Sequence, residues 1–192
     1  MLFNKKASLE MSIQAIVIIV LAMTLLGLGL GFVKNMFGNI ESLSRATFDK
    51  VADQLQRDLV SSNEKLIFSQ TKINLERGKS ALLGFGVKND GGTPLSYWAE
   101  FSGIKCPNAC PIVEELNEGI NEQPPWFTFK YNKDGQDPKL LYKVGAADQQ
   151  VNRVDLSIPK SAAPGLYLLG LTIYDASSDG QYASTEIFVT VS

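Results

Sequence analysis

Two cysteines lie four positions apart in this chain of 192 residues, at Cys106 and Cys110. In an oxidising compartment, two thiols this close form a small disulfide loop that fixes a connection between strands. A metal site needs more ligands than these two residues supply, and the chain contains no histidine. We therefore expect a structural disulfide, with a free or reducible pair as the alternative.

The lack of histidine also restricts catalysis, because Ser-His-Asp and Cys-His mechanisms are excluded in their usual forms. The remaining candidates for acid–base chemistry are four glutamates after the cysteines, whose Asn, Gly and Pro neighbours predict a solvated loop. They are Glu114, Glu115, Glu118 and Glu122. The run Gly78–Ser80 lacks the spacing of a phosphate-binding loop. We expect no enzymatic activity and no cofactor.

Neither a metal ion nor a nucleic acid is an expected partner. Asn132, Asp134 and Asp137 have calcium-like spacing, but the run lacks the glutamate that completes a calcium loop, so a turn is expected. The chain carries 18 basic and 20 acidic residues, a net charge of −2, with no basic block. This composition does not favour binding to DNA or RNA.

Residues 11–33 form an uncharged apolar run near the start of the chain. About 20 apolar residues in a helix span the hydrocarbon layer of a bilayer, so we expect a transmembrane helix. Lys5 and Lys6 precede the run, and the positive-inside rule predicts a cytoplasmic amino terminus and an extracellular carboxy-terminal domain. The run is too long for the apolar core of a cleaved secretory signal peptide.

The helix is expected to continue beyond the membrane. Apolar or small residues recur in steps of three and four from Val33 to Leu59, which is the period of a helix face. We expect one continuous helix from about Ser8 to Ser62. The apolar face of its outer half packs either against its own domain or against copies of itself.

The chain then changes to short alternating runs separated by Gly, Pro, Asn and Asp, which predict about seven strands and a β-sandwich. The expected strands are 66–75, 80–89, 94–102, 126–131, 150–158, 165–175 and 182–191. Trp98 and Trp126 could line a ligand surface, but their alternating neighbours favour core packing. The expected organisation is a leader at 1–7, a transmembrane or assembly helix at 8–33, an amphipathic stalk at 34–62 and a head at 63–192.

The head resembles the immunoglobulin-like modules of prokaryotic surface proteins. The stretch Glu76–Tyr97, ERGKSALLGFGVKNDGGTPLSY, resembles their early strand pair, and Val154–Asp175, VDLSIPKSAAPGLYLLGLTIYD, resembles their later strands. The resemblance implies an α+β chain in which a long amino-terminal helix precedes an all-β immunoglobulin-like sandwich. It bears on the fold more than on the function.

The stretch Lys5–Val33, KKASLEMSIQAIVIIVLAMTLLGLGLGFV, resembles the class III signal and assembly helix of archaeal type IV pilins and archaellins. In that family a membrane peptidase cuts before the apolar segment, and the helix packs into the core of a filament. The resemblance implies a cut after Ala7, which makes Ser8 the new terminus. It also makes Glu10 a candidate partner for the terminal amine of a neighbouring subunit.

Three residues in the helix are candidates for assembly contacts. A carboxylate at the apolar edge is costly unless it reaches the interface or pairs with a cation, so Glu10 either lies at headgroup level near Lys6 or meets that amine. Gly27 and Gly31 have the spacing that lets two helices approach closely, or they permit a bend.

These features predict a structural subunit of an extracellular type IV pilus-like filament, used in adhesion or motility. Its expected partners are the membrane, identical subunits, a prepilin peptidase and an assembly machinery. The alternative is a single-pass anchored surface protein whose immunoglobulin-like domain binds another component and never polymerises.

Overall fold

The computed structural model describes the backbone of residues 5–120 and 123–192, and all of their side chains except those of residues 5–12, 34–46 and 134. The chain divides into two compact units, Met1–Ala46 and Thr47–Ser192.

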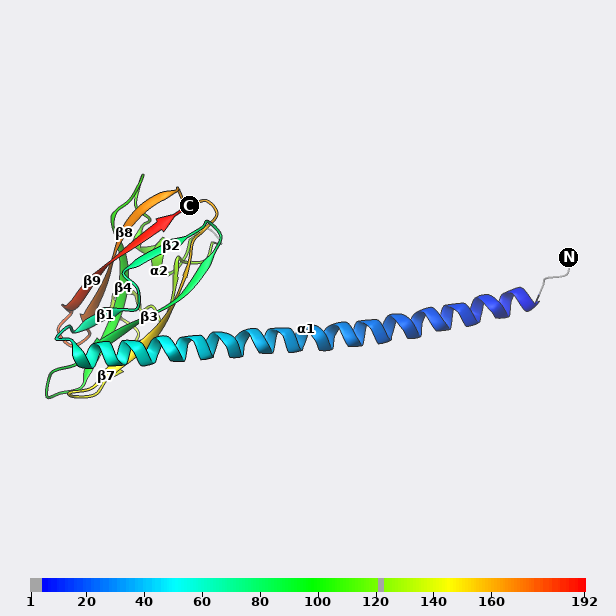
Figure 1. Cartoon of the computed structure of the whole chain (residues 1–192), viewed down its shortest axis with the longest axis horizontal. Coiled ribbons are helices and arrows are strands. Elements are labelled where there is room, and N and C mark those ends of the chain that lie inside the picture. Colours follow the sequence, from blue (N-terminus) through cyan, green and yellow to red (C-terminus); the bar gives the residue numbers. More distant parts are fainter. Residues whose placement is uncertain (1–4, 121–122) are drawn as a thin grey trace. The chain divides into compact units, whose positions relative to one another are not determined.

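One helix, α1 (Lys5–Ser61), contributes to both units (Figure 1). Its 57 residues agree with the expected continuous helix from about Ser8 to Ser62. The helix ends where Ser62 and Asn63 lead into the first strand, and the Ser62 N–H donates to the Asp58 carbonyl at 2.9 Å. The second unit, which contains the last turns of α1, is otherwise mostly β structure.

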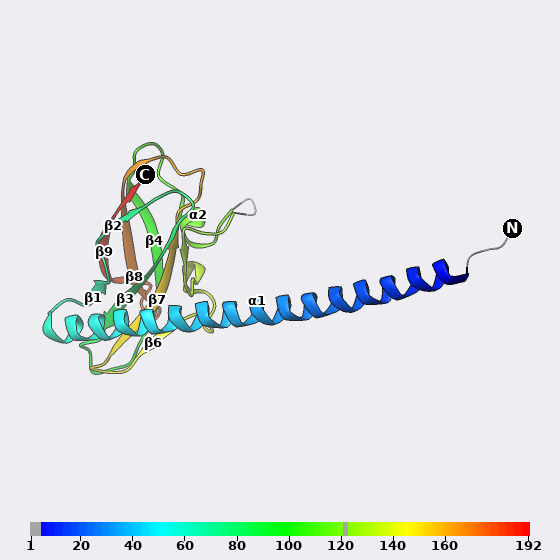
Figure 2. The ribbon, with the colours of Figure 1, turned by 45° about the vertical axis from the view of Figure 1, so that its right-hand side comes forward.

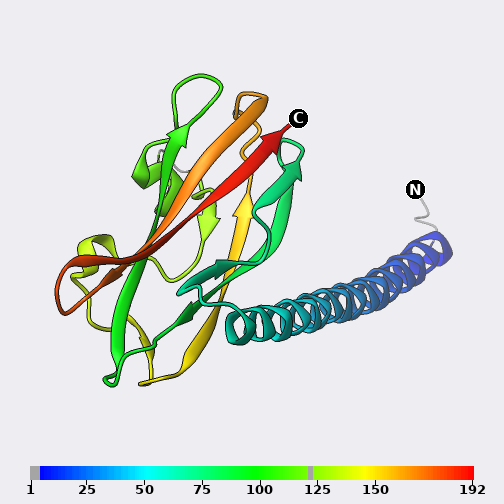
Figure 3. The ribbon, with the colours of Figure 1, turned by 60° about the vertical axis from the view of Figure 1, so that its left-hand side comes forward.

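Two sheets form the second unit (Figure 3). The four-stranded sheet has the order β1-β3-β7-β5, and the five-stranded sheet has the order β2-β9-β8-β4-β6. The strands are β1 (Leu66–Phe68), β2 (Lys72–Leu75), β3 (Ser80–Lys88), β4 (Leu95–Lys105), β5 (Phe127–Thr128), β6 (Tyr142–Val144), β7 (Gln149–Ser157), β8 (Gly165–Asp175) and β9 (Gly180–Val191). A short helix, α2 (Val113–Asn117), and a 3-10 turn, η1 (Lys133–Gly135), lie between β4 and β6 in the sequence.

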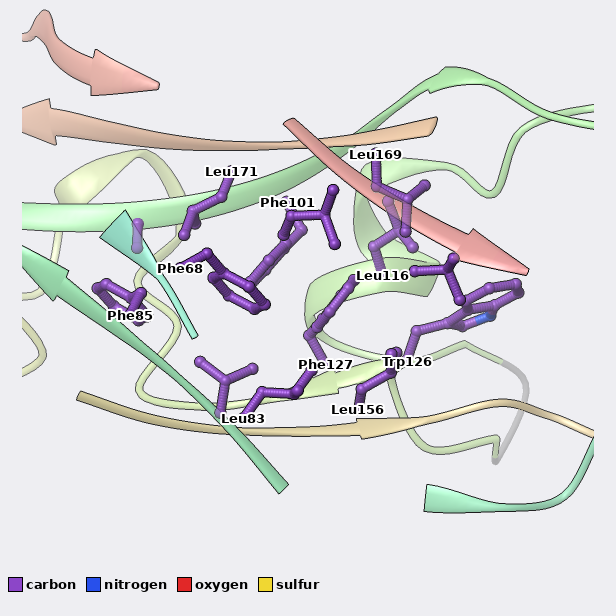
Figure 4. Packing of buried hydrophobic residues seen from close by; sticks show 14 of the residues in the cluster. Phe68, Leu83, Phe85, Phe101, Leu116, Trp126, Phe127, Leu156, Leu169 and Leu171 are labelled. Carbon is purple, nitrogen blue, oxygen red and sulfur yellow. The ribbon is translucent and has the colours of Figure 1, made fainter. Parts of the chain in front are cut away.

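The core lies between the two sheets because alternate side chains of each strand point inward. Phe85 on β3 and Phe101 on β4 are fully buried. Phe101 stacks on Phe127 of β5 with ring centroids 3.7 Å apart (Figure 4). Leu116 of α2 and Trp126 belong to the same cluster. Side chains from both sheets and from α2 therefore share one core.

The last turns of α1 pack on the outer face of the four-stranded sheet. Gly84 and Gly86 of β3 have no side chains there, and Leu55 and Leu59 of α1 lie over them. Leu55 is 2% exposed and Leu59 is fully buried. A Cβ added at Gly86 would overlap the Leu59 Cδ1. The two glycines therefore allow the helix to approach the sheet closely, and this part of the expected stalk packs against its own domain.

Polar contacts hold the carboxy-terminal end of α1. The last carbonyls of a helix lack partners within the helix. The Lys88 Nζ donates to the carbonyls of Leu59 at 3.4 Å and Ser62 at 3.3 Å, placing a cation at the negative end of the helix dipole. The Gln149 Nε2 donates to the Gln56 carbonyl at 3.4 Å. Two strands of the sheet, β3 and β7, thus bind the helix end.

The expected number of about seven strands is too low, because the described residues form nine. The single strand expected at 66–75 is two strands in different sheets. The Ser69 N–H donates to the Gly84 carbonyl in one sheet, and the Thr71 carbonyl accepts from the Phe188 N–H in the other. No Gly or Pro marks this crossing, so the sequence pattern did not reveal it. β6 was missed because it is only three residues long.

Replacing Gly86 with valine is expected to lower the free energy of unfolding by about 1–3 kcal/mol, the usual cost of overpacking. The new side chain would displace Leu59 and with it the helix. Guanidinium denaturation of the full chain in detergent, followed by tryptophan fluorescence, measures this change. Gly92→Ala is the control, because a Cβ there meets no atom within 4 Å. Equal stability of the two variants would contradict the close helix–sheet contact.

Candidate assembly and binding surfaces

The apolar segment of α1 is the largest exposed apolar surface of the described chain. Every side chain from Ile13 to Val33 is exposed, and none of this 21-residue segment is buried. The segment is long and apolar enough to cross a membrane. Within the first unit, nothing described covers it.

The one hydroxyl near the middle of this segment is compatible with an apolar environment. Thr24 Oγ1 donates to the carbonyls of Val20 at 2.7 Å and Leu21 at 3.0 Å. In lipid, a polar group without a hydrogen-bond partner costs several kcal/mol, about as much as in a hydrocarbon solvent. Because the threonine bonds within its own helix, it adds little to that cost.

Gly27 and Gly31 lie on this exposed helix, and a Cβ added at either would meet no atom within 4 Å. Their surfaces are therefore free of contacts from the described chain, as a close helix–helix contact would require.

The expected processing residues lie in α1, but their side chains lie outside the described ones. These processing residues are Lys5, Lys6, Ala7 and Ser8. The side chain of Glu10, the expected assembly residue, also lies outside the described ones.

The expected disulfide is present between Cys106 and Cys110, with Cα atoms 5.1 Å apart. The loop folds back on the end of β4, where a Cβ on Gly103 would come within 2.6 Å of the Cys110 Cβ. Pro107 within the loop lies against Gly165 at the start of β8, which has a φ of +139°. The disulfide loop therefore connects the ends of two neighbouring strands and leads directly into α2.

α2 closes part of the edge of β4 (Figure 2). The side-chain amide of Asn117 accepts from the Phe101 N–H and donates to the Phe101 carbonyl, both at 2.8 Å. The same amide donates to the Val113 carbonyl at 2.7 Å. Asn117 thus replaces a neighbouring strand at Phe101, beyond the point where β6 stops pairing at Tyr97.

The expectation that the glutamate run is a solvated loop is wrong for its first part. Glu114 and Glu115 lie in α2, which is fixed by the fully buried Leu116 and by Asn117. The sequence did not indicate this helix because it is only five residues long, with Val113 and Leu116 as its apolar residues. Glu118 is exposed just after α2, and Glu122 lies outside the described residues.

Glu114 does not have the environment of a general acid. Glu114 makes an ion pair of 3.5 Å with Lys133, and both side chains are largely exposed. A hydrogen bond from its own backbone N–H, and then Lys133, lower the pKa of Glu114. This shift stabilises the charged form, whereas a general acid needs a raised pKa. Among the described residues no group of three His, Cys, Asp or Glu side chains could hold a metal ion.

Two buried tyrosines carry the larger pKa shifts. Burial raises the pKa of Tyr97, and it raises that of Tyr142 to about 12. The Tyr97 hydroxyl accepts from the Asn152 Nδ2 at 2.7 Å, and the Tyr142 hydroxyl accepts from the Lys130 N–H at 3.0 Å. Both phenols remain neutral near pH 7 and act as structural hydrogen-bonding groups between the strands.

The calcium-like run forms a turn, as expected. The Asn132 side chain accepts from the Asp137 N–H at 3.0 Å and donates to the Asp137 carbonyl at 2.8 Å. Gly135 in this turn lies against the Trp98 indole, where a Cβ would come within 2.6 Å of the Nε1.

The two tryptophans are both buried. Trp126 lies in the core between the sheets, as expected. Trp98 differs, because it lies on the outer face of the five-stranded sheet. It stacks on Tyr174 of β8 with centroids 4.2 Å apart, beneath the turn at Gly135. An insertion between β5 and β6, rather than the opposite sheet, excludes it from water.

No known protein family and no curated protein matches the sequence. The chain has a loose likeness to a family 123 glycoside hydrolase from Clostridium perfringens, with 10% identity, a TM-score of 0.44, and coverage of 73% of this chain and 25% of the hydrolase. A Niemann-Pick type C2 protein from the Japanese carpenter ant has 10% identity, a TM-score of 0.40 and coverage of 66% and 89%. The CupB2 chaperone of Pseudomonas aeruginosa has 15% identity, a TM-score of 0.36 and coverage of 65% and 55%. The chain therefore spans about a quarter of the hydrolase.

Replacing Asn117 with leucine is expected to lower the free energy of unfolding by about 2 kcal/mol or more, because the buried N–H and carbonyl of Phe101 would lose their partners. Denaturation measures this change, and amide hydrogen exchange at Phe101 is expected to accelerate. Asn74→Leu, at an exposed position of β2, is the control. Unchanged exchange at Phe101 would show that Asn117 does not close the strand edge.

Proposed function

We propose that this protein is a structural subunit of a type IV pilus-like surface filament that assembles through α1. One observation carries the proposal: all side chains of Ile13–Val33 are exposed in a helix whose last turns are fixed to a folded domain. Such a helix needs apolar surroundings, which either lipid or identical helices can supply. The sequence resemblance of Lys5–Val33 to archaeal pilins and archaellins supports the second possibility in the mature protein.

The energetics favour exchange of one apolar environment for another. Full burial of a Leu, Ile, Val, Phe or Met side chain stabilises by about 1.5–3 kcal/mol, so exposure of the whole segment to water would cost tens of kcal/mol. Lipid gives no hydrophobic drive for helix association, and close packing at small residues such as Gly27 and Gly31 replaces it. The helix would therefore leave the membrane only as it is buried against other copies.

The second unit is then the head of the subunit, an immunoglobulin-like sandwich on the extracellular side. A leader of residues 1–7 would remain cytoplasmic until a prepilin peptidase cuts after Ala7. The Cys106–Cys110 disulfide suits an oxidising compartment outside the cytoplasm. The head has a structural or adhesive role, without enzymatic activity, a cofactor or a nucleic-acid partner.

A second candidate function is that of an anchored surface protein that binds another component and does not polymerise. It is favoured by the outer face of the five-stranded sheet, which carries the exposed apolar residues Ile104 and Leu166. In this case α1 would stay in the membrane and Met1 would be retained.

Mass spectrometry of the protein from its native cells separates the two functions. A filament subunit is expected to begin at Ser8, because the peptidase removes residues 1–7 before assembly. A uniformly intact Met1 would overturn the filament proposal. Negative-stain microscopy of sheared surface filaments, with antibodies to the head, provides the second measurement.

Substitution of Glu10 by alanine tests the assembly contact. Loss of one partner of a buried ion pair costs about 3–5 kcal/mol, so filament yield is expected to fall at least a hundredfold while the membrane pool of subunit persists. Gln14→Ala, one helical turn further along α1, is the control. Equal filament yields from the two variants would remove Glu10 from the mechanism.

A further inference from the structure

The outer faces of the two sheets carry two different surfaces. On the four-stranded side, the last turns of α1 form a groove with the sheet, which we call the α1 groove. On the five-stranded side, exposed side chains form what we call the outer patch. Figure 3 shows that the end of α1 and the strands β8 and β9 lie on opposite sides of the second unit. No described element covers either surface.

The α1 groove combines the apolar residues Val51, Leu55 and Leu82 with polar side chains, and it has a charged residue near each end. Its volume is about 250 Å³. It is lined by Lys50, Val51, Gln54, Leu55, Asp58, Ser69, Gln70 and Leu82. Asp58 accepts a hydrogen bond of 2.8 Å from the Gln54 Nε2, which holds its carboxylate at the rim. Lys50 and Asp58 are about 12 Å apart along the helix, at 1.5 Å per residue.

The outer patch is a cluster of apolar side chains on β4, β8 and β9. Ile104 is 52% exposed and Leu166 is 54% exposed, and Leu168 and Phe188 are partly exposed beside them. The Ile104 side chain lies over the buried Gly170, where a Cβ would be 3.2 Å from the Ile104 Cδ1. An apolar ridge therefore faces solvent.

Two opposite charges border the outer patch. Lys105 on β4 pairs in register with Leu168, and Glu186 on β9 pairs with Gly170. The two charged residues thus lie two strand spacings and two residues apart, a diagonal of about 12 Å from the usual sheet dimensions. This matches the separation of Lys50 from Asp58. Among the described residues, Lys50, Lys105 and Glu186 have no ion-pair partner.

We propose that the outer patch of one copy docks into the α1 groove of a second copy. Ile104 and its apolar neighbours then cover Val51 and Leu82, Glu186 approaches Lys50, and Lys105 approaches Asp58. The partner is a second copy because this one chain carries both pairs of opposite charges at similar separations. Charge pairs at the rim fix the register, while burial of the apolar centre provides the affinity.

The contact joins two different surfaces, so each added copy leaves one groove and one patch unoccupied. Such a heterologous contact continues without closing unless its rotation makes a ring, and it therefore suits a filament. The inference rests on the proposed function, and it assigns the contact between neighbouring heads in addition to the contact between helices.

Cysteine cross-linking of the full chain in native cells tests the contact. Gln70→Cys places a thiol at the groove and Ile104→Cys places one in the patch. The chain with both substitutions is expected to give a ladder of dimers, trimers and longer species on mild oxidation. Either single variant is expected to give monomer alone. Dimers from Ile104→Cys alone would mean that patch meets patch, which would overturn the proposal.

Charge reversal tests the register in the same double-cysteine chain. Lys50→Glu or Glu186→Lys is expected to reduce the ladder at least threefold, and the two together are expected to restore it within twofold. Lys139→Glu, on an exposed loop, is the control. Filaments without a ladder would overturn the head contact while leaving the proposed function intact. A retained Met1 with no filaments would overturn the proposed function, and the ladder would then decide the contact separately.

Discussion

Water cannot surround the side chains of Ile13–Val33 without a cost of tens of kcal/mol, given about 1.5–3 kcal/mol for each large apolar side chain. Nothing described in the first unit buries them. The hydroxyl of Thr24 already donates hydrogen bonds within the helix, so moving it into an apolar environment costs little free energy. The segment therefore requires either lipid or other protein, and every functional interpretation of the chain has to meet this requirement.

The same helix is also part of the β domain. Leu55 and Leu59 occupy the space that Gly84 and Gly86 leave open, and Lys88 binds the last carbonyls. A packed contact of this kind fixes the rotation of the helix end about its axis as well as its position, because only one face bears the buried leucines. The face that α1 presents to the groove is thereby determined by the sheet. The packing of α1 on the sheet and the proposed head contact depend on the same few turns.

The periodicity of the sequence predicted the elements that bury many apolar residues. The long helix, the strands β3, β4, β7, β8 and β9, and the disulfide follow from patterns of 3.6 and 2 residues and from cysteine spacing. The sequence did not reveal contacts made by single side chains. Asn117 could not be recognised as a substitute strand, because its partner Phe101 lies sixteen residues earlier and no local pattern links them. The outer position of Trp98 likewise depends on the turn at Gly135, which returns to it from a distant part of the chain.

The short strands at the edges of the two sheets limit how copies of this domain could pair through their strands. The strands at the edges, β1, β2, β5 and β6, are two to four residues long, whereas the inner strands are nine to twelve. Short edge strands offer few free N–H and carbonyl groups, and Asn117 occupies those of Phe101 on β4. A long unpaired edge strand would instead be a template for strand pairing between copies. Because short edges disfavour strand pairing, the proposed contacts between copies use the faces of the sheets and α1, where side-chain shape and charge can select one partner and one register.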